Sequence, residues 1–217
     1  MENKPNIKMV RIDERLIHGQ GQLWIKSLGV NLAICANDAV STDELQQTLM
    51  TTVLPKEVNV RFWTIQRTAE IIWKAAPHQT IFVVVSSPAD ALRLCELGFP
   101  MENVNVGNIH AAPGKDKVSQ FIYLGEEDKQ ALRTMKEKYN VQFNTKTSPV
   151  TNDGAQTLEK LLEMKRGKKS KMGKKVKIGR KSKKLLFSMV FLAISAFSFA
   201  DGEDYQDYKA LLIGDVN

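Results

Sequence analysis

Five consecutive apolar residues, Ile81 to Val85, constrain the fold of this chain more than any other feature. A strand that is apolar on both sides has to be covered on both faces, which is typical of the centre of a parallel sheet. Around this segment, apolar runs suited to strands alternate with helical patterns through residues 1–164. This alternation predicts an α/β fold with a mostly parallel central sheet, right-handed crossovers and helices on both faces.

The individual elements follow from the same patterns. The predicted strands are 7–12, 32–36, 58–64, 80–85 and 104–106, with weaker candidates at 118–123 and 141–143. The predicted helices are 21–28, 42–53, 68–76, 89–97, 126–139 and 153–164. Local signals agree, because Ser87-Pro88 places proline at an early helical position and Gly98 stands where a C-terminal cap belongs.

The net charge of +7 is concentrated at the C-terminal end of the chain. Residues 165–217 carry a net charge of +8, whereas residues 1–164 are nearly neutral at −1. We therefore predict one domain over 1–164, followed by a basic and apolar C-terminal tail of a different kind. The tail comprises a basic linker with 12 Lys and Arg over 165–184, an uncharged apolar segment over 185–200 and a polar end over 201–217.

Three interpretations of this tail stay open. Sixteen apolar residues are fewer than the roughly 20 that span a bilayer, and with basic residues before them they resemble a secretory signal peptide. We favour an in-frame fusion to the start of an exported protein. A membrane tether, with its basic residues against anionic lipid, is the second interpretation. Nucleic-acid binding is the third and is disfavoured, because the basic run lacks interleaved aromatic residues.

Two cysteines are too few for a disulfide scaffold. Cys35 and Cys95 both lie in apolar runs, which predicts buried free thiols in a reducing compartment. The sequence also has no Cys/His spacing typical of a metal site, no Walker-type phosphate loop and no dinucleotide-binding fingerprint.

A charged turn follows the first predicted strand and presents His18 just before a helix begins. Open α/β sheets place their chemistry at this position, beyond the carboxyl end of a strand. A neutral imidazole can accept a phosphoryl group near pH 7. Arg11 and Arg15 would supply cations, Asp13 would orient the imidazole or an arginine, and backbone N–H groups after Gly19 would form an anion nest. The alternative is a structural histidine in a turn.

A second polar cluster follows the strand predicted to end near Gly107. In a parallel sheet its loop, with Asn108 and His110, lies on the same edge as His18. We expect His110 to line the pocket, with a loop histidine bonded to backbone as the alternative. His78 precedes a strand and should lie at the opposite edge, as a structural or surface residue.

Residues 11–20, with the sequence RIDERLIHGQ, resemble the phosphorylation-site signature of enzyme IIB of the mannose/fructose/sorbose-type sugar phosphotransferase system. The similarity extends over about residues 5–162, and the combination is most similar to the N-acetylgalactosamine/galactosamine subgroup. The matching segments are 36–38, 46–50, 60–64, 75–79 and 104–110. One departure is Gly21, where family members usually carry an aliphatic residue.

The resemblance implies a phosphotransferase in which His18 accepts a phosphoryl group from the phosphohistidine of a IIA protein. His18 would then pass this group to an incoming sugar, N-acetylgalactosamine or galactosamine, at the IIC/IID membrane complex. Arg15 and Asp13 would stabilise the phosphate and orient the histidine. The remaining pocket residues would be Arg11, Gly19, Gln20, Gly107, Asn108 and His110.

Such a protein would need no cofactor or metal and would not bind nucleic acid. It would be cytoplasmic, peripherally associated with the inner face of the membrane, and able to form a homodimer. From the residues alone, two other functions stay open. One is a non-catalytic, doubly wound ligand-binding module, and the other is a membrane-tethered interaction protein acting through its tail.

Overall fold

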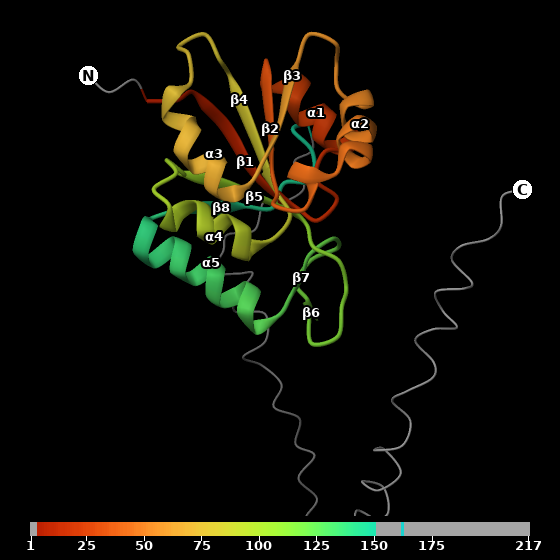
Figure 1. Ribbon diagram of the computed structural model, residues 1–217. Helices are drawn as coiled ribbons and strands as arrows, with labels where there is room; N and C mark the ends of the chain where they lie inside the picture. Colours follow the sequence, from red (N-terminus) through yellow and green to blue (C-terminus); the bar gives the residue numbers. More distant parts are fainter. Residues whose placement is uncertain (1–3, 151–161, 163–217) are drawn as a thin grey trace, which may run out of the picture. The chain divides into compact units, whose positions relative to one another are not determined.

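Six parallel strands form the central sheet, in the order β3-β2-β4-β1-β5-β8 (Figure 1). The structure is a computed structural model that describes residues 4–150 and residue 162. The strands are β1 Ile7–Asp13, β2 Leu32–Ala36, β3 Asn59–Trp63, β4 Ile81–Val85, β5 Asn103–Asn108 and β8 Gln142–Asn144. The predicted mostly parallel α/β sheet is confirmed.

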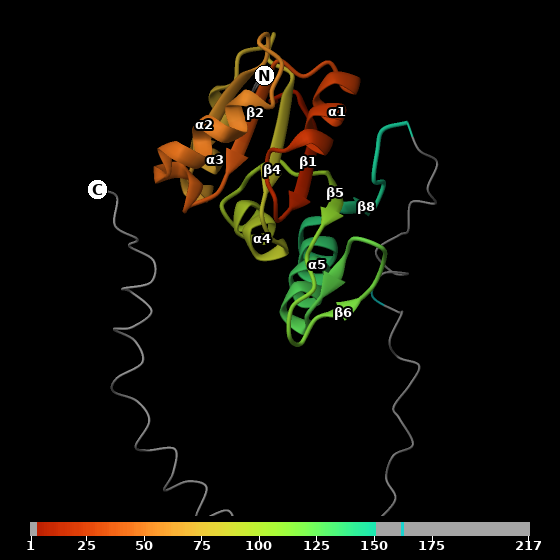
Figure 2. The ribbon, with the colours of Figure 1, turned by 90° about the vertical axis from the view of Figure 1, so that its right-hand side faces the viewer.

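Helices cover both faces of this sheet. They are α1 Gly19–Ser27, α2 Glu44–Thr52, α3 Ile65–Ile71, α4 Pro88–Glu96 and α5 Glu126–Tyr139, with short 3-10 turns η1 Val40–Thr42 and η2 Ile72–Lys74. Figure 1 shows α3, α4 and α5 on one side of the strands, and Figure 2 is seen from the side of α1 and α2. Helices on both faces, as predicted, enclose two separate hydrophobic clusters.

Strand β4 explains why two clusters form. Its side chains alternate: Ile81, Val83 and Val85 pack into the cluster of α3–α5, and Phe82 and Val84 pack into the cluster of α1. All five are at most 1% exposed. A strand buried on both faces needs an uninterrupted apolar run, which is the feature that identified it in the sequence.

The two cysteines belong to this core. Cys35 and Cys95 are buried free thiols, as predicted. Burial raises the pKa of Cys35 to about 12 and that of Cys95 to about 11, because an apolar interior disfavours the thiolate. Both cysteines are therefore packing residues.

Helices α2 and α3 begin next to their capping side chains, and these starts differ from the ones that apolar periodicity predicts. Helix α3 begins at Ile65 rather than at 68, because the hydroxyl of Thr64 accepts a hydrogen bond from the backbone N–H of Arg67 (3.1 Å). Asp43 caps α2 in the same way, and the residues before it form η1. The proline at the start of α4 and the positive φ of Gly98 (80°) after it agree with the sequence.

The weak strand predicted at 118–123 is not present as a sheet strand. This segment instead lies in a small hairpin of β6 Asp116–Lys117 and β7 Tyr123–Leu124 that precedes α5. The chain turns back within the predicted segment, where Val118 and Ser119 both donate to the carbonyl of Ile122 (2.9 and 3.2 Å). The segment meets the end of β5 at Ile109, whose N–H donates to the carbonyl of Phe121 (2.9 Å) and whose carbonyl accepts from Tyr123 (3.1 Å).

The helix predicted at 153–164 lies outside the described residues, apart from Leu162, which packs against the core. The basic, apolar and polar tail segments, 165–184, 185–200 and 201–217, also lie outside them. Within the described part, no helix has the length and apolar character needed to cross a bilayer.

The strand order places a topological switch point between β1 and β4. These neighbouring strands send their following helices, α1 and α4, to opposite faces. The carboxyl ends of the strands at such a switch point are the usual ligand position in open α/β sheets. Loops after β1 and β5 both emerge there, since these two strands are parallel neighbours.

Candidate active site

A buried ion pair lies at the carboxyl end of β1. Arg11 and Asp13 sit two residues apart on β1, so both side chains project from the same face of the strand. The guanidinium Nη2 and Nε lie 2.8 and 3.2 Å from Oδ2 of Asp13, and Nη1 donates to Oδ1 of Asn105. Arg11 is 1% exposed and Asp13 is fully buried. Several hydrogen bonds to one carboxylate are what makes such a buried charge tolerable.

Gly107 makes room for this pair. A Cβ atom at this position would overlap the guanidinium carbon of Arg11. Only a residue without a side chain lets the β5 backbone approach the arginine so closely. Arg11 and Gly107, both predicted as pocket residues, thus lie together in the support beneath Asp13.

His18 is held above the same carboxylate. Its Nε2 lies 2.9 Å from Oδ2 of Asp13, and its Nδ1 accepts from the backbone N–H of Gln20 (3.3 Å) as the N-cap of α1. An ionised carboxylate only accepts hydrogen bonds, so the ring proton belongs on Nε2. Nδ1 then carries the lone pair, which accepts the N–H of Gln20 in the first turn of α1. The histidine side chain is 19% exposed.

Arg15 brings a second cation to Asp13 from the solvent side. Its Nε and its backbone N–H lie 3.3 and 3.2 Å from Oδ1, and its Nη2 donates to the side-chain carbonyl of Gln20 (2.7 Å). The Arg15 side chain is 39% exposed, in contrast to Arg11. The exposed guanidinium is therefore available to an anion arriving at His18.

These contacts keep Asp13 ionised. Burial raises the pKa of Asp13, but the hydrogen bond from His18 and the charge of Arg11 outweigh it and lower the pKa to about 2. Burial lowers the pKa of Arg11, and the charge of Asp13 opposes that shift. At neutral pH the carboxylate is an acceptor for every donor around it.

The turn between Asp13 and His18 contains backbone strain. Leu16 has a φ of 56°, a left-handed conformation that costs a non-glycine residue about 1–2 kcal/mol. Its backbone N–H closes the turn on the carbonyl of Asp13 (2.9 Å), and its side chain is 5% exposed in the cluster of α1. Burial of this leucine offsets the strain, and the turn brings the chain back toward Asp13. The sequence pattern did not predict this turn.

The loop after β5 forms a second wall. Asn108 is the register partner of Asp13, and its Nδ2 lies 3.1 Å from Nε2 of His110. Glu14, which the sequence did not single out, binds this loop by accepting from the backbone N–H of His110 (2.9 Å). The His110 side chain is 57% exposed. The structure thus brings the two predicted clusters together at one edge of the sheet.

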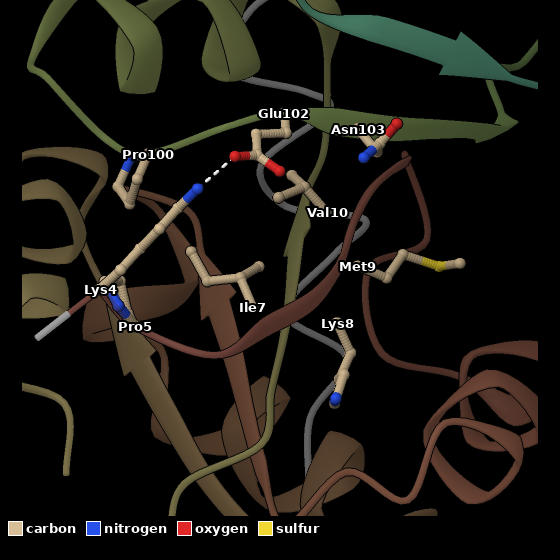
Figure 3. A pocket seen from close by; sticks show the side chains of 9 residues that line it. All are labelled: Lys4, Pro5, Ile7, Lys8, Met9, Val10, Pro100, Glu102 and Asn103. Atoms are coloured by element: carbon tan, nitrogen blue, oxygen red, sulfur yellow. Dashed lines mark hydrogen bonds and ion pairs between the residues drawn. The ribbon is translucent and has the colours of Figure 1, made fainter. Parts of the chain in front are cut away.

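The opposite edge is different in character. Exposed His78 lies there, and its carbonyl accepts from the side chain of Asn31 (2.9 Å), as expected for a surface residue. A cavity of about 70 Å³ near the amino ends of β1 and β5 contains the ion pair between Lys4 and Glu102 (Figure 3). This volume holds one or two waters. Among residues 4–150 and 162, no group of three His, Cys, Asp or Glu side chains is arranged to hold a metal ion.

Comparison with known proteins agrees with this geometry. The family model described as PTS system sorbose subfamily IIB component matches residues 7–173. The chain belongs to this family. Its members are components of a sugar phosphotransferase system, and the resemblance found in the sequence, including that to the N-acetylgalactosamine subgroup, is confirmed.

The matches span most of the length of each relative. The N-acetylgalactosamine-specific phosphotransferase enzyme IIB components 1 and 2 of Escherichia coli (strain K12) are 41% and 44% identical to the chain. These matches cover 62% and 61% of this chain and 86% and 85% of the relatives. The crystal structure of a PTS-dependent N-acetylgalactosamine IIB component from Streptococcus pyogenes is 51% identical, with a TM-score of 0.70. It covers 71% of this chain and 96% of that one.

Two glycines near the IIB site should respond oppositely to alanine. Gly107→Ala should lower the free energy of unfolding by about 1–3 kcal/mol, because the new methyl group displaces Arg11. Gly21→Ala in α1 meets no atom within 4 Å and should raise it by about 0.5–1 kcal/mol. Urea unfolding of both variants measures this, and equal effects at the two positions would contradict the account of Gly107.

The free energy of unfolding should depend on pH because of the buried carboxylate of Asp13. The pKa of Asp13 is lower in the folded protein (about 2) than in an unfolded chain (about 3.9), so its contribution is complete above about pH 4 and is lost as pH falls toward 2. Asp13→Asn leaves Arg11 unpaired and should cost about 3–5 kcal/mol at pH 7. Denaturant unfolding between pH 7 and pH 2.5 should show this deficit shrinking with acid, and a constant deficit would contradict the assignment.

Proposed function

We propose that the chain carries a phosphoryl group on Nδ1 of His18, between a IIA phosphohistidine and a sugar. The observation that carries the proposal is the hydrogen bond between Nε2 of His18 and Asp13 (2.9 Å). It holds the ring proton on Nε2 and leaves Nδ1 as a nucleophile at the start of α1. Membership of the IIB family supports the same reaction class.

The first transfer, from the donor phosphohistidine to His18, needs no net proton movement. The hydrogen bond from the N–H of Gln20 to Nδ1 opens, and the Nδ1–P bond forms as the N–P bond of the donor breaks. The electron pair of the broken bond returns to the donor nitrogen. The proton on Nε2 stays in its hydrogen bond with Asp13, whose negative charge stabilises the positive charge that develops on the ring. Phosphoryl transfer of this kind depends on positioning and charge stabilisation more than on acid–base steps.

Two features of the site suit the phosphoryl oxygens. Exposed Arg15 is held at its edge by Asp13 and Gln20 and can offer N–H groups to the anion. The opening backbone N–H groups of α1, from Gly19 onward, add a positive dipole end, and the first turn of this helix contains no acidic residue. The loop of Asn108 and His110 bounds the other side.

The partners and substrate follow from the reaction class and the relatives. A IIA protein would donate the phosphoryl group, and IIC/IID membrane subunits would present the sugar hydroxyl that receives it from His18. In this second transfer the O–P bond would form as the Nδ1–P bond breaks, the electron pair would return to Nδ1, and the hydroxyl proton would leave to solvent. N-acetylgalactosamine or galactosamine is the proposed sugar, because two relatives above 40% identity are named for N-acetylgalactosamine. The chain would then work at the cytoplasmic surface of the membrane, bound to those subunits.

Replacement of the acceptor should abolish labelling. Gln at position 18 can still donate to Asp13, but it has no ring nitrogen that forms a phosphoramidate, so His18→Gln should accept no phosphate from the phosphorylated IIA donor. Phosphopeptide mass spectrometry measures this. His78→Gln, at the opposite sheet edge, is the matched control and should label normally. Full labelling of His18→Gln would refute the proposal.

Loss of the exposed cation should slow transfer without unfolding the protein. Arg15→Ala should reduce the rate of His18 phosphorylation by about 10²-fold, as for removal of one preorganised donor to a transition-state anion. Arg61→Ala, on edge strand β3, removes an exposed arginine away from the site and should leave the rate unchanged. Rapid-quench kinetics gives the rates, and equal rates for wild type and Arg15→Ala would exclude the arginine as a phosphate ligand.

A further inference from the structure

Glu14 joins the two loops that form the site. Its backbone N–H donates to the carbonyl of Asn108 (3.0 Å), and its Oε2 accepts from the backbone N–H of His110 (2.9 Å). The same Oε2 lies 2.7 Å from Nδ1 of His110, and Oε1 lies 3.3 Å from Nζ of Lys115. One residue of the signature turn thus makes four contacts with a loop that lies about a hundred positions away in the sequence.

The phosphoryl-transfer reaction described above does not use this carboxylate. Glu14 follows Asp13 directly, but its side-chain contacts within residues 4–150 all run to the loop of His110 and Lys115. The side chain is 27% exposed, so most of it is withdrawn from water. A largely buried carboxylate that binds three donors on one loop is suited to holding that loop in place.

The loop is anchored in turn to α5. Lys115 lies between two carboxylates, since its Nζ is also 3.2 Å from Oδ2 of Asp128. Asp128 accepts from the backbone N–H of Gly125 (3.0 Å) at the start of α5. Leu132 on this helix is fully buried in the core. The connection therefore runs from the signature turn through Glu14 and Lys115 to a helix that is fixed by packing.

The position of the loop matters because it lies next to the reacting group. Asn108 is paired in register with Asp13, which orients His18. Glu14 also selects the ring state of His110, because a carboxylate at Nδ1 places a proton there and leaves Nε2 to accept from Asn108. Misplacement of a site wall by about 1 Å can cost a large factor in rate.

We propose that Glu14 is a positioning residue that fixes the wall of Asn108 and His110 against the turn carrying His18. The inference rests on the proposed phosphoryl transfer through His18 and adds a residue that sets the geometry of that transfer. Glu14 acts through His110 and Lys115 and does not contact the phosphoryl group itself.

The test compares kcat and KM for phosphorylation of His18 by the phosphorylated IIA donor. Glu14→Gln keeps the shape of the side chain but turns a donor toward either His110 or Lys115, so kcat should fall about 10-fold. KM for the donor protein should change less than about twofold, because the substitution keeps the shape of the side chain. His110→Ala releases the same wall and should add little to the loss in the double variant.

Glu102→Gln is the matched control. Its carboxylate pairs with Lys4 near the amino ends of β1 and β5, outside the connection through Glu14, so the variant should leave kcat within about twofold. Lys115→Met, which keeps the contact between Glu14 and His110, serves as a second variant should Glu14→Gln fail to fold. It is expected to lose about two- to threefold in kcat.

Failure of the proposed function and failure of the positioning role give different experimental results. Wild-type protein that is not labelled at His18 would refute the proposed function and this inference with it. Normal wild-type labelling, combined with an unchanged kcat for Glu14→Gln, would refute the positioning role alone. The role would also be refuted by an equal kcat loss in Glu102→Gln. Losses of Glu14→Gln and His110→Ala that multiply in the double variant would refute it as well, as would an unchanged kcat for Lys115→Met where Glu14→Gln does not fold.

Discussion

One buried carboxylate organises the functional edge of this protein. Asp13 accepts hydrogen bonds from Arg11 below it, from Arg15 beside it and from His18 above it. The buried carboxylate stabilises the charges and orientations of its donors. The donors in turn replace the water that this carboxylate lost on burial. The histidine is thereby oriented without packing into the core, and its other nitrogen faces the first turn of α1, where it accepts the N–H of Gln20. The site is built around the group that holds the histidine as much as around the histidine itself.

The parallel sheet supplies the rigid frame for this arrangement. Arg11 and Asp13 project from one face of β1, and β5 runs beside it with Gly107 at the point of closest approach. Strands that are fixed by packing on both faces cannot shift to relieve a clash, so the space for the guanidinium has to be built into the sequence of β5. Helix α1 then begins at Gly19 with His18 as its N-cap, which places the positive end of the helix dipole at the candidate phosphate position.

Much of this was predictable, and the failures have local causes. The apolar run of β4 and the amphipathic pattern of α5 depend on near neighbours in the chain, and both elements appear where the patterns place them. The predicted strand at 118–123 failed because its apolar residues reverse direction within a hairpin. Gly107 was predicted as a pocket residue, and nothing in the sequence indicated that Arg11 occupies the space at its Cβ position. Periodicity reports which residues are buried, but it does not report which side chain a buried glycine accommodates.

The sequence by itself determined the fold class, the family and the identity of the candidate nucleophile, because those depend on local patterns and on one contiguous signature around His18. Tertiary structure alone decided which nitrogen of that histidine is free, which arginine is buried and which is exposed, and that Glu14 joins the signature turn to the loop of His110. These properties depend on distances between strands and loops that lie far apart in the chain. Such distances are set only when the sheet has formed and its two faces are packed.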